Sequence, residues 1–193
     1  MSADLPFPTA SQTVGPYYSI GLTWEASNVL VNERTRGERI AIRGRVLDGN
    51  RHGVEDALIE TWQANSDGHY ASAEDTRQPA ARDGFTGFGR VIPDPDGRFE
   101  LVTVRPGRVP GLGGTLQAPH IAVSVFARGL LQRLVTRIYF PQEPGANVAD
   151  RVLASVAPAR RATLIAQPDA TARGTYHWNV ILQGEHETVF FEC

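Results

Sequence analysis

The sequence predicts a mainly all-β protein, a β-sandwich with an extended N-terminal arm over residues 1–39 and one or two short helices near residues 150–166. Three observations predict this fold class. Short apolar and β-branched runs recur from residue 40 onward, turn residues separate them, and strand-like runs never alternate with long helical ones. We therefore expect a single domain, with the sandwich spanning residues 40–193.

The predicted strands are the apolar and β-branched runs of residues 40–47, 57–63, 89–92, 99–104, 120–126, 133–140, 176–183 and 187–191. Between them stand turn residues such as Asp67, Gly68 and Gly97, which suit tight turns and positive φ. The last two runs flank residues 183–186, so we expect them to form a C-terminal hairpin.

The arm carries Pro6, Pro8 and Pro16, which fix φ and remove backbone donors, so an extended and irregular course is expected. It also carries aromatic side chains that a free, disordered segment would not need. The arm is therefore expected to pack, either against its own domain or against a partner chain. In residues 150–166 the spacing is helical, and Pro158 divides that segment into at most two short helices.

Composition excludes several classes of function. The 193 residues carry a net charge of −2 with no lysine, which gives no indication of a polyanion-binding surface. Cys193 is the single cysteine, so neither an intrachain disulfide nor a cysteine metal cluster can form. No apolar run approaches the roughly 18 residues of a membrane span, and the first residues lack a signal-peptide pattern, so a cytoplasmic, soluble protein is expected. Zinc, phosphate-loop and serine-hydrolase motifs are also absent.

Three longer stretches, residues 44–70, 87–107 and 118–141, together with residues 11–17 and 184–191, resemble the intradiol ring-cleaving dioxygenases. The resemblance implies a β-sandwich and an enzyme of aromatic catabolism that inserts both atoms of O₂ into a catechol, between its two hydroxyls. In active chains it implies an Fe(III) ion held by two tyrosines and two histidines. That set suits a hard trivalent cation, because two tyrosinates balance its charge and two imidazoles complete the shell.

Only half of that ligand set is present here. The first family tyrosine corresponds to Tyr70, but the second falls on Val109, which has no donor atom. The first histidine corresponds to His120, and the second falls on Ala122. We therefore expect this chain to bind no metal and to contain no catalytic residue, with Tyr70 and His120 kept as buried structural residues.

Two neighbouring pocket positions have changed as well. Gln117 stands where active chains have an arginine, and Gly111 stands where they have a tryptophan. A replacement ligand would have to come from His69, which strand alternation would direct to the face opposite Tyr70.

Within the family, this incomplete set resembles the α-type chains, which pair with a homologous iron-bearing β subunit. The resemblance implies that the β partner holds the Fe(III), and that protocatechuate and O₂ react in its pocket to give 3-carboxy-cis,cis-muconate. It further implies a large αβ hetero-oligomer in which Thr13, Gly15 and Pro16 of the arm, and Arg128, help to form the partner's substrate pocket. An ordinary turn at Gly15 and Pro16, and a surface or interface ion pair at Arg128, stay open as alternatives.

Two other functions also stay open. One is a self-sufficient intradiol dioxygenase with an atypical iron shell built on Tyr70 and His120. The other is a stand-alone β-sandwich binding module.

Overall fold

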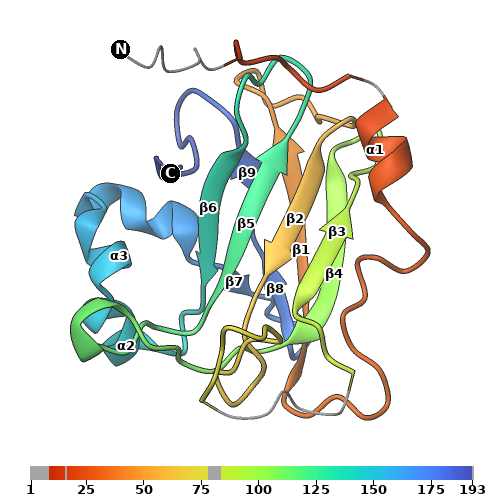
Figure 1. Ribbon diagram of the computed structural model, residues 1–193. Helices are drawn as coiled ribbons and strands as arrows, with labels where there is room; N and C mark the ends of the chain where they lie inside the picture. Colours follow the sequence, from red (N-terminus) through yellow and green to blue (C-terminus); the bar gives the residue numbers. More distant parts are fainter. Residues whose placement is uncertain (1–8, 16, 78–83, 193) are drawn as a thin grey trace, which may run out of the picture.

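The computed structural model describes residues 9–15, 17–77 and 84–192. Two sheets pack face to face (Figure 1). In the first sheet the strand order is β4-β1-β8-β7, with β9 also paired to β1, and in the second it is β3-β2-β5-β6. The strands are β1 (Arg39–Leu47), β2 (Leu58–Trp62), β3 (Phe88–Val91), β4 (Arg98–Val104), β5 (His120–Phe126), β6 (Leu134–Tyr139), β7 (Gln167–Pro168), β8 (Thr175–His177) and β9 (Val180–Ile181). The predicted β-sandwich is confirmed.

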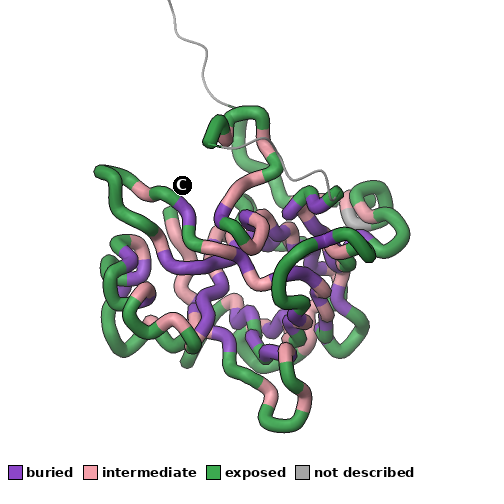
Figure 2. Tube along the Cα trace, turned by 90° about the horizontal axis from the view of Figure 1, so that it is seen from below, coloured by how far each residue is buried: buried purple, intermediate pink, exposed green. Residues whose placement is uncertain are grey.

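Strand β5 shows how alternation builds the two layers. Ile121, Val123 and Val125 are buried in the core between the sheets. Because successive side chains of a strand point to opposite faces, His120 and Ala122 lie on the outer face of the second sheet. Buried backbone runs through the middle of the molecule and exposed backbone through the surrounding loops (Figure 2).

Helical segments are short. They are α1 (Tyr17–Leu22), α2 (Pro144–Ala149), α3 (Arg151–Ser155) and the 3₁₀ helices η1 (Leu112–Gly114) and η2 (Pro158–Leu164). The two short helices expected near residues 150–166 correspond to α3 and η2, and Pro158 opens η2 as its first residue. In the described part of the chain, no helix has the length and apolar character needed to cross a membrane.

A second apolar cluster lies where α3 and η2 pack near β6. Its buried members are Ala118, Tyr139, Leu153, Val156 and Leu164. Asp150 begins α3, because its Oδ1 accepts hydrogen bonds from the backbone N–H groups of Val152 and Leu153, at 2.9 Å each. This packing fixes the surroundings of the outer face at the His120 end of β5.

The expectation of a wholly extended arm is wrong for residues 17–22, which form α1. The Tyr18 hydroxyl anchors this turn by donating to the backbone carbonyls of Asp56 and Phe126. Further along, Leu30 donates its N–H to Val102 O at 2.8 Å and is buried in the core. The described part of the arm therefore packs against its own domain.

The predicted C-terminal hairpin is also wrong in its second strand. Its first run is divided into β8 and β9, which both pair in parallel with β1. The backbone N–H of Thr188 donates to Ile181 O at 2.9 Å, as in a hairpin. The Ile181 N–H, however, donates to the side-chain hydroxyl of Thr188 at 2.9 Å. The chain then leaves β9, and Phe191 donates its N–H to Val135 of β6 at 2.7 Å. A side-chain acceptor thus replaces the ladder bond that a hairpin would continue.

Candidate functional site

The residual metal positions lie on the outer face of the second sheet, where one row of side chains crosses all four strands. Phe88 of β3 pairs with Trp62 of β2, Trp62 with Ala122 of β5, and Ala122 with Arg137 of β6. Directly paired residues share a face, with Cβ atoms about 5 Å apart. Ala122, at the second histidine position, therefore stands between an indole and a guanidinium.

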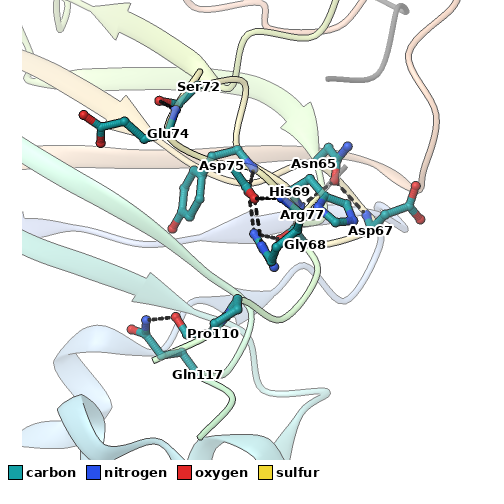
Figure 3. Close-up of polar contacts among 11 residues, drawn as sticks. Asn65, Asp67, Gly68, His69, Ser72, Glu74, Asp75, Arg77, Pro110 and Gln117 are labelled. Carbon is teal, nitrogen blue, oxygen red and sulfur yellow. Dashed lines mark hydrogen bonds and ion pairs between the residues drawn. The ribbon is translucent and has the colours of Figure 1, made fainter. Parts of the chain in front are cut away.

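Tyr70 is held by the loop that follows β2. Asn65 Oδ1 accepts from the N–H groups of Asp67 at 3.0 Å and His69 at 2.9 Å, which folds the chain back on itself. Tyr70 N–H then donates to Asp75 Oδ2 at 2.9 Å, and Arg77 pairs with the same carboxylate (Figure 3). The loop thus fixes the backbone of Tyr70 without using its phenol.

The Tyr70 ring stacks on Trp62, with ring centroids 5.7 Å apart and planes 9° apart. Burial raises the pKa of the phenol, and the positive charge of Arg137 opposes that rise. The ring lines an open cavity of about 580 Å³, together with Trp62 and Pro110. Tyr70 is therefore a half-buried, protonated phenol at neutral pH.

The strand argument applied to His69 is wrong, because β2 ends at Trp62 and His69 lies in the loop beside Asn65 (Figure 3). Its Nδ1 is buried and has no hydrogen-bond partner in the part of the chain that the structure describes.

His120 is 5% exposed, and its Nδ1 lies 2.8 Å from the carbonyl oxygen of Ala118. Since a carbonyl can only accept, Nδ1 carries the proton and Nε2 is the unprotonated nitrogen of the neutral ring. Burial first, and the charge of Arg137 second, lower the pKa of His120 to about 4. The expectation of a buried imidazole with a hydrogen-bond partner holds for this residue.

Arg137 is a site residue that sequence reasoning missed. Its Nη1 donates to Gln117 Oε1 at 2.7 Å and contacts the Tyr139 hydroxyl at 3.4 Å. Its charge acts on the pKa of Tyr70, His120 and Tyr139, so the guanidinium lies among the residual metal-site side chains. Alternation along residues 133–140 would have placed Arg137 on the face of Tyr139, but only the strand register places it opposite Ala122.

Val109 and Gln117 are joined across the loop between β4 and β5. Val109 is 2% exposed, and its carbonyl accepts from Gln117 N–H at 2.8 Å. Gln117 Nε2 donates to Pro110 O at 3.0 Å (Figure 3). Gln117 therefore ties the former tyrosine turn, at Val109 and Pro110, to Arg137.

The residues expected to serve a partner lie at the opposite end of β5. Thr13 Oγ1 accepts from Gly129 N–H at 2.7 Å, and Arg128 forms an ion pair with Asp56. In Figure 1 residues 9–15 of the arm pass over the β5–β6 connection at this end, whereas the chain enters β5 at the other. The structure thus brings Thr13 and Arg128 together and keeps both away from Tyr70 and His120. Gly15 lies exposed next to this region, and Pro16 lies outside the described residues.

Comparisons with known proteins show the family of this chain. A family model described as Dioxygenase matches residues 13–184. The chain belongs to the intradiol dioxygenase family. It is 40% identical over 205 residues to the protocatechuate 3,4-dioxygenase alpha chain of Pseudomonas putida, with all of both chains covered.

Two further family members place the chain more broadly. It is 34% identical over 168 residues to the protocatechuate 3,4-dioxygenase beta chain of Burkholderia cepacia, covering 83% of this chain and 71% of that one. Among solved structures, the dioxygenase domain of a carbohydrate-binding fusion protein from Streptomyces sp. SirexAA-E matches with a TM-score of 0.61 and 26% identity, covering 95% of this chain and all of that one. Both chains named for protocatechuate 3,4-dioxygenase are thus relatives of this one.

The intradiol family depends on non-haem iron, and the residues of this chain do not fit an Fe(III) ion. Tyr70 and His120 could donate, but the other two positions hold the aliphatic side chains of Val109 and Ala122. The Arg137 guanidinium opposite Ala122 also adds a positive charge where the family binds a cation.

The side-chain oxygen atoms next to His120 do not replace the two missing metal ligands. Tyr139 donates its hydroxyl to Asp150 Oδ1 at 3.2 Å, and Asp150 Oδ2 accepts from Ala118 N–H at 2.7 Å. Both side chains are therefore already used in hydrogen bonds within the fold. No group of three or more His, Cys, Asp and Glu side chains among the described residues is arranged to hold a metal ion.

Proposed function

We propose that this chain is the non-catalytic α subunit of a protocatechuate 3,4-dioxygenase. In the assembled enzyme a homologous β subunit holds the Fe(III), and protocatechuate reacts with O₂ to give 3-carboxy-cis,cis-muconate, which retains both oxygen atoms. The observation that carries the proposal is the full-length similarity to an alpha chain, combined with a ligand set in which Val109 and Ala122 replace two donors.

The exposed side chains of the arm support the proposal that a partner chain binds there. Tyr17 is 80% exposed, Ile20 is 72% exposed and Trp24 is 51% exposed, all within one short segment. Large apolar side chains that gather on a surface in this way are typical of protein interfaces. In the proposal, this segment is covered by the β subunit.

Thr13 and Gly15 have features suited to a pocket shared with that subunit. Thr13 is fixed to the β5–β6 connection through Gly129, so the start of the arm has a defined position. A Cβ atom at Gly15 would meet nothing within 4 Å, so packing within this chain does not require glycine there. Close approach of a flat substrate ring would require it. Pro16 is the third arm residue that the proposal assigns to this pocket.

Arg128 is the charged group that this chain offers. Its ion pair with Asp56 holds the guanidinium, while the side chain stays 61% exposed. A guanidinium has two edges that can donate, so Arg128 can keep Asp56 and still bind the carboxylate of protocatechuate. Its role is to position the substrate and to balance its charge.

Co-expression with the iron-bearing β chain and steady-state kinetics test this role. R128Q is expected to raise KM for protocatechuate about tenfold or more, with iron content unchanged, because a charge-assisted hydrogen bond is lost. R173Q, at an exposed arginine of the β7–β8 connection, is the matched control and should leave KM unchanged. Equal kinetics in R128Q and the unmodified complex would contradict the assigned role.

A further inference from the structure

A small cavity opens beside the residual metal positions, between the loop before β5, strand β6 and helix α3. Its volume is about 260 Å³, and its lining includes Gln117, Arg137 and Arg151. We call it the Arg137–Arg151 pocket. None of its described lining residues is acidic, so two guanidinium groups face a space without a carboxylate in its wall.

The partners of Arg137 are neutral. Its guanidinium is bound by the amide oxygen of Gln117 and the hydroxyl of Tyr139, and the ion pairs among the described residues include neither Arg137 nor Arg151. A half-buried cation held only by neutral acceptors keeps an unmet preference for an anion.

Asp150 is the buried carboxylate next to this region, and its acceptor sites are occupied. Oδ1 accepts from Val152 N–H, Leu153 N–H and the Tyr139 hydroxyl, and Oδ2 accepts from Ala118 N–H. Asp150 is fully buried, and these four donors hold it in place. It therefore reduces the local positive potential but does not form an ion pair with either arginine.

The other walls are apolar and limit the kind of anion that fits. Leu112, Leu116 and Val152 line the pocket, and Leu112 is 87% exposed. An ion surrounded by water would gain nothing from these side chains, whereas an apolar body attached to the charged group would bury their surface. The volume suits a ligand of about one ring.

We propose that the Arg137–Arg151 pocket binds a small organic carboxylate, whose charged group pairs with the two guanidinium groups and whose apolar body packs against Leu112, Leu116 and Val152. A carboxylate matches the planar donor edge of arginine in two parallel hydrogen bonds. The positive charge that makes this face unsuitable for Fe(III) thereby makes it suitable for an anion.

Titration calorimetry on the full chain tests the proposal with benzoate as the probe. Benzamide, which has the same shape without the charge, should bind at least tenfold more weakly than benzoate. Inorganic phosphate, which has charge without an apolar body, should also bind at least tenfold more weakly. Equal affinity for benzamide would contradict the role of the arginines, and equal affinity for phosphate would contradict an organic ligand.

Variants locate the site. R137Q and R151Q should each weaken benzoate binding at least tenfold, and R173Q, at an exposed arginine outside the pocket, should leave it unchanged. Arg151 is exposed, so R151Q tests the pocket even where R137Q disturbs the fold. Benzoate affinity that survives R151Q, or that falls equally in R173Q, would overturn the proposal.

Discussion

Restoring the family ligand set in this chain should not by itself restore iron binding, because Arg137 stands opposite one of the restored positions. Two tyrosinates would leave Fe(III) with a net charge of about +1. Because Ala122 and Arg137 are directly paired across β5 and β6, we expect an iron ion held at position 122 to lie roughly 6 Å from the guanidinium. At an effective dielectric constant of about 20, two unit charges at that separation repel by about 3 kcal/mol. That repulsion corresponds to about a hundredfold loss of affinity.

The comparison is between V109Y/A122H and V109Y/A122H/R137Q, with bound iron and the visible tyrosinate-to-iron absorption as readouts. The triple variant should bind Fe(III) about a hundredfold more tightly. V109Y/A122H/R133Q, which removes an exposed arginine just before β6, should behave like the double variant. Equal iron affinity of the double and triple variants would refute the electrostatic argument.

Val109 is buried, so its enlargement to tyrosine can disturb packing. A122H and A122H/R137Q give the same comparison at an unchanged Val109. The pKa of the introduced histidine, followed by NMR, should be higher in the absence of the Arg137 charge. An unchanged pKa would place Arg137 too far away to matter.

Three further predictions concern stability. The pKa of His120 is about 4 in the folded protein and about 6.5 in the unfolded chain, so the unfolded chain binds the proton more readily. The contribution of His120 to the free energy of unfolding is therefore complete at neutral pH and is lost as the pH falls from about 6.5 to about 4. Unfolding in urea should therefore show a loss of about 2 kcal/mol between pH 7 and pH 4.5 that H120Q lacks and the exposed-site variant H52Q retains. Y18F should cost about 1 kcal/mol in thermal unfolding, because two backbone carbonyls lose their donor, whereas Y17F at an exposed ring should cost nothing measurable. D150A should cost about 3 kcal/mol or more, since it removes a helix cap and leaves buried donors unpaired, and a stable variant would show that these bonds contribute little.

The strands that sequence patterns predict best are those with continuous alternation and clear turn residues. The run of residues 120–126 has the bounds of β5, because Ile121, Val123 and Val125 share one buried face. The prediction from alternation fails at the C-terminus, because the Thr188 hydroxyl accepts the Ile181 N–H in place of a backbone carbonyl. Only the folded structure shows that this side chain lies within reach. Helix α1 was missed because its packing depends on Tyr18 reaching backbone carbonyls that are distant in sequence.

Part of the candidate site, too, can be predicted from the sequence, and part of it depends on the folded structure. Motif position is enough to show that Val109 and Ala122 lack donor atoms, because that is a property of residue type. The role of Arg137 depends on pairing between β5 and β6, and register is a long-range property that one sequence does not state. The contact of Thr13 with Gly129 likewise joins residues 116 positions apart.

We propose that this chain supplies shape and charge while a companion chain supplies the metal. Iron analysis of the purified αβ complex tests it most directly, together with the same analysis on this chain expressed alone. We expect one iron per αβ pair in the active complex and no coloured ferric site in the isolated chain. Two irons per pair, or tyrosinate-to-iron absorption from this chain alone, would contradict it.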